Sequence, residues 1–142
     1  MDKFLYYARA VDNTMLAALS SIAACHSIGT EETMDSITRL LNYAATHPHA
    51  VIRFTASEMI LQGDSDAAYL VCPKARSRAG GYHFLGNRER TQFNGPIYIL
   101  AKTIKHVMSS AAEAEAIALF MNSQELVPLR LCLEELGHKQ LA

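Results

Sequence analysis

The order of the periodic segments along the chain is the feature that most limits how it can fold. In the first part, apolar residues recur at helical spacing after Asp12-Asn13-Thr14 and again after Thr30-Glu31-Glu32-Thr33, two stretches typical of helix N-termini. His47-Pro48-His49 ends the second segment, because the residue before a proline is disfavoured in a helix. We therefore expect a pair of helices in residues 1–49, the first of two domains.

From position 50 onwards the pattern changes to short segments typical of strands. They read AVIRF, MILQGDSDAAYLV, GGYHFL and GPIYILAKTIKHVM, and those past residue 58 predict three strands. Gly80-Gly81 precedes a strand and is expected to form a turn or bulge. Ser109-Ser110 then begins a long helix, which Pro128 is expected to kink or end. The order predicts an α+β fold in which residues 50–142 form an antiparallel or mixed sheet with a long helix packed on it.

The composition indicates a folded protein of an intracellular, reducing compartment. Of the 142 residues, 50% are hydrophobic and 19% are charged, which is typical of a globular chain. Cys25, Cys72 and Cys132 are odd in number and far apart, so free thiols are expected rather than disulfides or a zinc site. No apolar run approaches the roughly 20 residues of a membrane span, and no secretory signal pattern is present, so no membrane partner is expected.

Basic residues are concentrated in one stretch of the chain. The net charge is −1, yet residues 72–107 contain seven Lys or Arg residues and a single acid, Glu89. Such a block is typical of a surface that contacts nucleic-acid phosphates, and it equally suits a solvated loop with a charged edge strand. The candidate nucleic-acid-binding residues are Lys74, Arg76, Arg78, Arg88 and Arg90.

Two pairs of carboxylates are the candidate catalytic groups. Asp64 and Asp66 are two apart in a predicted strand, so both side chains leave the same face of the sheet. Glu113 and Glu115 begin the long helix, where only one of them can face the sheet. One carboxylate from a strand and one from the helix packed on it begin a divalent-metal site for phosphodiester hydrolysis. The structural alternative is that the aspartates belong to turns and the glutamates stabilise the helix dipole.

Three stretches of the chain resemble the ribonuclease H region of copia-type LTR retrotransposon polyproteins. They are GDSDAAYLV at 63–71, ARSRAGGYHFL at 75–85 and SSAAEAEAIAL at 109–119, and YYARAVDNTMLAALSSIAA with LLNYAATHP is similar to the helical segment between polymerase and nuclease. The resemblance implies Mg²⁺- or Mn²⁺-dependent hydrolysis of the RNA strand of RNA–DNA hybrids. It implies Asp66 and Glu115 as metal ligands, Asp64 as a supporting charge, and Arg76-Ser77-Arg78 as a contact with the hybrid's phosphates.

The chain also departs from the family pattern. The family has two further acids and usually five strands, whereas Asp66 is the last aspartate here and Glu125, Glu134 and Glu135 lie in helical sequence. The paired aspartates of a polymerase are not present either. We therefore expect a C-terminally truncated, incomplete ribonuclease H-like domain that is inactive alone. Its exposed sheet edge predicts either a homo-oligomer, in which strands can be swapped, or an autonomous remnant that has rebuilt this edge. The alternative is a non-catalytic module that binds nucleic acid or associates with itself.

Overall fold

A computed structural model describes residues 2–25 and 29–141 and divides the chain into two compact units, residues 1–52 and 53–142. The sequence placed the boundary at residue 49. The first unit is helical, and the second combines a sheet with a long helix, so the fold class is α+β.

The first unit is helical, and the two predicted caps are present in it. The Asp12 side chain accepts a hydrogen bond from the Thr14 N–H (3.1 Å), and that of Thr30 accepts one from the Thr33 N–H (3.2 Å). The cap at Thr30 confirms the predicted start of the second helix, whereas Asp12 caps a 3₁₀ turn that leads directly into the first. A further helix that the sequence did not predict precedes them. The elements are α1 (Asp2–Ala10), the 3₁₀ turn η1 (Asn13–Met15), α2 (Leu16–Ala24) and α3 (Glu31–Thr46).

The second unit contains a three-stranded antiparallel sheet. Its strands are β1 (Ile60–Cys72), β2 (Arg76–Gly86) and β3 (Pro96–Thr103), in the order β1-β2-β3. The three strands predicted past residue 58 are confirmed, whereas AVIRF forms none. Gly80 and Gly81 lie inside β2, paired with Asp66 and Ser65 of β1, so the predicted turn or bulge at these glycines was wrong.

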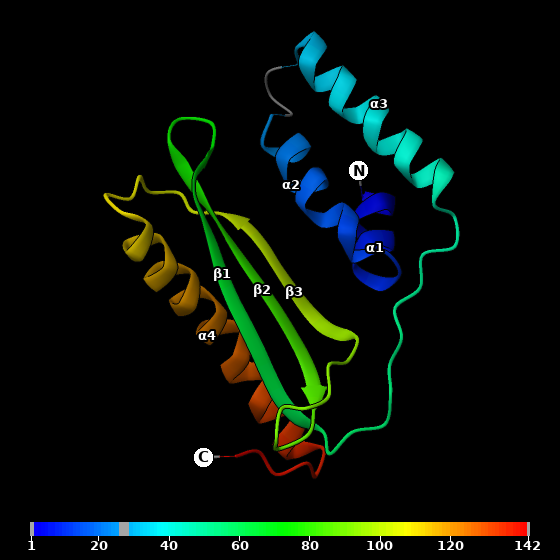
Figure 1. The fold of residues 1–142 in the computed structure, drawn as a ribbon, viewed down its shortest axis with the longest axis vertical. Coiled ribbons are helices and arrows are strands. Elements are labelled where there is room, and N and C mark those ends of the chain that lie inside the picture. The colour runs from blue at the N-terminus through cyan, green and yellow to red at the C-terminus, as the bar shows by residue number, and fades with distance from the viewer. Residues whose placement is uncertain (1, 26–28, 142) are drawn as a thin grey trace. The chain divides into compact units, whose positions relative to one another are not determined.

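The long helix α4 (Ala111–Glu135) packs along one face of this sheet (Figure 1). The Ser110 hydroxyl accepts a hydrogen bond from the Glu113 N–H (3.1 Å), which confirms the predicted N-cap. Pro128 lies within the helix and does not end it. Small residues allow the close approach of helix and sheet. The core between them comprises Ala79, Leu100, Ile104, Met108, Ala114 and Ala118.

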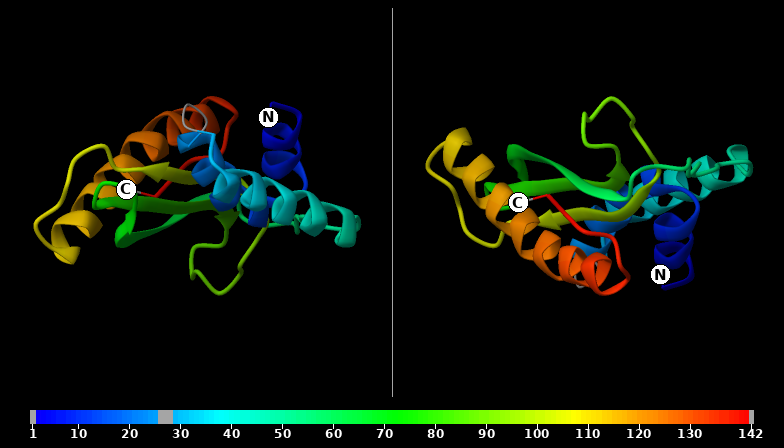
Figure 2. Two further views of the ribbon diagram at one scale, coloured as in Figure 1. Left: turned by 90° about the horizontal axis from the view of Figure 1, so that it is seen from above. Right: turned by 90° about the horizontal axis from the view of Figure 1, so that it is seen from below.

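The two faces of the sheet have different neighbours. Ser65 and Ala67 of β1 face α4, because Ser65 accepts a hydrogen bond from the Asn122 amide (3.0 Å) and Ala67 packs on the helix core. We call the other side of the sheet the open face. The connection from β2 to β3, residues 87–95, folds on this side, opposite α4 (Figure 2), where the Phe93 ring stacks on Tyr82 at 4.8 Å.

Two expectations drawn from composition concern thiols and membranes. Cys25, Cys72 and Cys132 are free. Within residues 2–25 and 29–141, no helix has the length and apolar character needed to cross a membrane.

Candidate functional site

Asp64 and Asp66 share one face of the sheet, and it is the open face. Side chains alternate along a strand, and their neighbours Ser65 and Ala67 point to α4. Both aspartates are exposed. The prediction that they leave the sheet together is therefore confirmed, but they point away from the helix that carries the glutamates.

Glu115 lies on α4, on the far side of the sheet from Asp66. It is exposed, and it precedes the buried Ala118 and Asn122 by three and seven residues, so it borders the sheet-facing side of the helix. The structure does not bring Asp66 and Glu115 together. Across the described residues, no three His, Cys, Asp or Glu side chains are grouped so that they could hold a metal ion. Asp66 and Glu115, the two carboxylates that the resemblance assigns to one ion, thus lie on opposite sides of the sheet.

Glu113 takes the capping role that was the alternative for the helix glutamates. Its carboxylate accepts hydrogen bonds from the hydroxyl and the backbone N–H of Ser109, both at 2.7 Å, while its own N–H donates to Ser110. These two bonds, the hydroxyl's first and then the backbone's, hold the pKa of Glu113 below its ordinary value. Ser110 thus caps the N–H of Glu113, and the Glu113 carboxylate in turn caps Ser109, the residue before the N-cap of α4.

A pH dependence of stability follows from this cap. Because the folded-state pKa of Glu113 is lowered, its contribution is present above the ordinary value of 4.5 and is lost as the pH falls through the folded value. We expect the melting temperature of the unchanged chain to decrease as the pH is lowered below about 4.5. The Glu113→Gln variant should have a lower melting temperature at neutral pH, and its melting temperature should decrease less on acidification. Thermal unfolding across pH measures this, with Glu115→Gln as the control. An identical pH profile for Glu113→Gln and the unchanged chain would contradict it.

Asp64 is engaged by the loop that follows β2. The Arg90 guanidinium donates to the Asp64 carboxylate at 2.9 Å, with both side chains more than half exposed (59% and 56%). Such a surface ion pair contributes at most about 1 kcal/mol. Asp66, by contrast, has no cationic partner among the described residues. The two aspartates thus differ in their neighbours although they share a face.

The predicted basic block separates into two groups at the ends of β2. Lys74 lies in the turn before β2, with Arg76 and Arg78 following at the start of the strand. Arg88 and Arg90 lie just past its other end. At roughly 3.3 Å per residue, Arg78 and Arg88 are about 33 Å apart along an extended strand.

Two other basic residues of the block, Lys102 and Lys105, lie on or just past β3. Lys105 lies near the first group, because its neighbour Ile104 donates from its N–H to the Ser77 carbonyl (2.8 Å). Lys102 lies on the helix side of β3, where it pairs with Glu125 of α4 at 3.1 Å and so lowers the pKa of that glutamate. The block is therefore not one continuous patch.

A buried polar network between sheet and helix was not anticipated from the sequence. His83 is fully buried, and its Nε2 lies 2.8 Å from Asn122 Oδ1. The Asn122 amide nitrogen donates to Ser65 Oγ and to the carbonyls of Gly80 and Ala118, at 2.8 to 3.0 Å. This network fixes the register between α4 and the centre of the sheet. A polar residue that interrupts an otherwise apolar face of a long helix is the signal that could have indicated it.

Comparisons with protein-family models, curated proteins and solved structures found no match. The relation to copia-type polyproteins therefore stays a prediction from the three motif stretches.

Proposed function

We propose that this chain is part of the ribonuclease H region of a copia-type LTR retrotransposon polyprotein, and that it does not cleave RNA–DNA hybrids by itself. The parent activity is divalent-metal-dependent hydrolysis of the RNA strand. The observation that carries the proposal is the order of elements: three antiparallel strands followed by a long helix packed on their sheet. Asp66 lies within the first strand and Glu115 near the start of that helix, the positions that the resemblance assigns to them.

The geometry of the carboxylates supports the proposal that this chain does not cleave the hybrid by itself. Asp66 leaves the open face and Glu115 stands on the helix that covers the other face, so they cannot bind one ion together. An ion held by a single carboxylate keeps most of its water and is poorly placed to orient an in-line attack. The resemblance and the basic residues at the two ends of β2 support contact with nucleic acid as the role of the unit.

The first test is incubation of the purified chain with a labelled RNA–DNA hybrid in Mg²⁺ and in Mn²⁺. We expect the hybrid to stay intact. Cleavage that is lost in both Asp66→Asn and Glu115→Gln would overturn the inactive assignment, because it would require the two carboxylates to meet. Cleavage that survives both substitutions would point to a contaminating nuclease and would be repeated after further purification.

Binding of the hybrid provides the second test, because phosphate contacts make affinity fall with salt. The side chains of Lys74, Arg76 and Arg88 have no ion-pair partner among the described residues. We expect Lys74→Ala/Arg76→Ala to reduce the slope of log affinity against log salt by about 2, and Arg88→Ala by about 1. Arg39→Ala, in the first unit, is the matched control. Slopes that do not change in the block variants would contradict nucleic-acid contact by these residues.

A further inference from the structure

One side of β1 is free of strand partners in the described part of the chain, because β1 is the edge of the sheet. The C-terminal tail reaches the start of this edge. Gln140 Oε1 accepts a hydrogen bond from the Leu61 N–H (2.8 Å), and Gln140 Nε2 donates to the Met59 carbonyl (3.0 Å). A neighbouring strand would make the same two bonds with its backbone. The Gln140 side chain therefore occupies the position of a strand on the outer edge of β1.

The direction of these bonds fixes the rest of the edge. Backbone N–H and C=O groups of one residue in an antiparallel strand point to the same side, and the side alternates along the strand. Since the Leu61 N–H points outward, so do the backbone groups of Gly63, Ser65 and Ala67. Within residues 2–25 and 29–141 these outward groups have no hydrogen-bond partner. They form a row of donors and acceptors ready to pair with another backbone.

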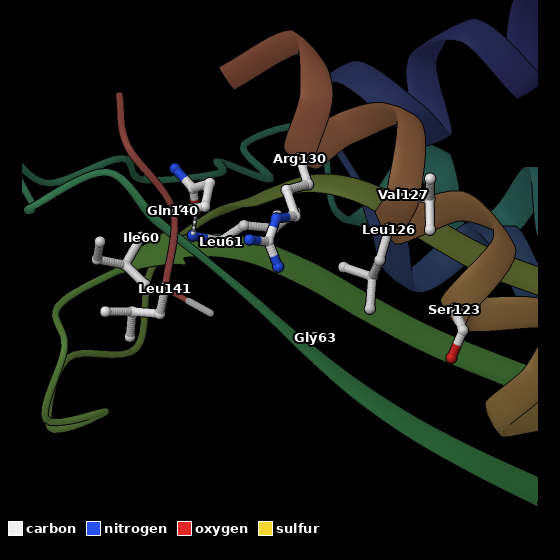
Figure 3. Close-up of a pocket in the computed structure, with 9 residues that line it drawn as sticks. All are labelled: Ile60, Leu61, Gly63, Ser123, Leu126, Val127, Arg130, Gln140 and Leu141. Atoms are coloured by element: carbon white, nitrogen blue, oxygen red, sulfur yellow. Dashed lines mark hydrogen bonds between the residues drawn. The ribbon is translucent and has the colours of Figure 1, made fainter. Parts of the chain in front are cut away.

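A groove of about 320 Å³ lies between the outer edge of β1 and α4 (Figure 3). Its walls include Leu61 and Gly63 of β1, Leu126, Val127 and Arg130 of α4, and Leu141 of the tail. A Cβ at Gly63 would lie only 3.1 Å from the Leu126 side chain, so the absent side chain helps to shape this narrow wall. Leu126 and Val127 give the helix side of the groove an apolar centre between Ser123 and Arg130, and the strand side offers backbone hydrogen bonds.

We infer that this groove binds an extended peptide segment of another protein as an added fourth strand beside β1. Residues of such a strand alternate between the two faces. Apolar side chains on one face would contact Leu126 and Val127. On the other face, basic side chains would meet Asp66, which is without a cationic partner, beside the Asp64–Arg90 pair. The expected ligand is therefore a strand in which apolar and basic residues alternate.

The same charges argue against a second copy of this chain in the groove. Antiparallel pairing of two β1 strands about Ser65 would place Asp64 opposite Asp66 of the other copy, twice on one face. Like charges directly opposite each other destabilise a strand pair. This inference does not rest on the nuclease relationship, and the predicted homo-oligomer is an alternative outcome of its test.

The experiment titrates the ¹⁵N-labelled full chain with a synthetic peptide of about eight residues in which valine alternates with lysine. A peptide in which valine alternates with glutamate is the control. We expect the lysine peptide to shift the amide signals of Gly63, Ser65 and Ala67 and to protect them from hydrogen exchange. The glutamate peptide should bind about tenfold more weakly or not at all. Asp66→Asn should reduce this preference.

Two further variants test the position of the added strand. Ala67→Pro removes one outward N–H, at an edge position where proline is tolerated, and should weaken binding about tenfold. Gln140→Ala frees the Leu61 N–H and should tighten binding several-fold. If Ala67→Pro does not fold, peptide binding by Gln140→Ala and Asp66→Asn still tests whether the added strand lies beside β1. Equal binding of both peptides, or a free chain that is dimeric with these three amides already protected, would overturn the inference.

Discussion

Gly81→Ala is expected to destabilise the second unit by roughly 3 kcal/mol, a large loss for a single methyl group. A Cβ at Gly81 would lie 1.7 Å from Asn122 Oδ1 and 2.7 Å from Asn122 Cγ, far inside contact distance. The Asn122 side chain must then leave its place. That movement breaks its bond with the buried His83 and leaves a polar group without a partner in the core.

The neighbouring glycine provides a matched control. A Cβ at Gly80 would meet nothing closer than the Asp66 carbonyl oxygen at 3.7 Å, an ordinary contact on the open face. Gly80→Ala should therefore change stability by less than about 1 kcal/mol. Native-state hydrogen exchange of β2 amides reports on the second unit alone and is the measurement of choice.

A double-mutant cycle separates the steric cause from a general effect of alanine in the strand. Asn122→Ala removes the atoms with which the new Cβ would collide, at the cost of the network itself. In that background Gly81→Ala should cost much less than it does in the unchanged chain. Equal costs of Gly81→Ala in the two backgrounds would show that the collision with Asn122 is not the cause.

Most elements of the two units could be predicted because their signals are local. Ser110 and Thr30 are caps recognised from a few neighbouring residues, and the strands are separated by Gly, Pro and Asn. The long helix was predicted from its composition, and of the two alternatives stated for Pro128 the helix does not end there. Pro128 lies on an exposed part of α4, where water can replace the hydrogen bond that proline cannot donate.

The orientation of the candidate carboxylates could not be obtained in the same way. Alternation places Asp64 and Asp66 on one face, but only packing decides which face the helix covers. The sequence does contain a hint in the intervening positions. Gly63, Ser65 and Ala67 are small, as are Ala114 and Ala118 of α4, and small residues on both partners are what a close helix–sheet contact requires.

The prediction of a turn or bulge at Gly80 and Gly81 was wrong for a related reason. Glycine marks a turn where the backbone needs a positive φ, yet neither Gly80 nor Gly81 adopts one. Gly81 is required because Asn122, distant in the sequence, lies directly over it. Long-range contacts of this kind cannot be read from a local pattern.

Ala118→Leu is expected to cost about 2–3 kcal/mol for a different reason, the spacing between α4 and the sheet. Ala118 is fully buried, in one core cluster with Ala79 and Leu100. Three added carbons have no space there, so the helix must move away from the sheet. That displacement would also stretch the Asn122–His83 bond one turn further along the helix, and the cost would exceed that of local crowding.

Ala116→Leu is the control for this substitution, because Ala116 is exposed on the same helix and leucine is nearly as good a helix former as alanine. It should change stability by less than about 0.5 kcal/mol. The hydrogen-exchange rates of the β2 amides should rise in Ala118→Leu and stay unchanged in Ala116→Leu. A similar small effect of both substitutions would mean that α4 is not held at this distance from the sheet, and the network of His83 and Asn122 would then lose its structural basis. A large effect of Ala118→Leu that disappears in Ala118→Ser would identify side-chain volume as the cause, since serine is close to alanine in size.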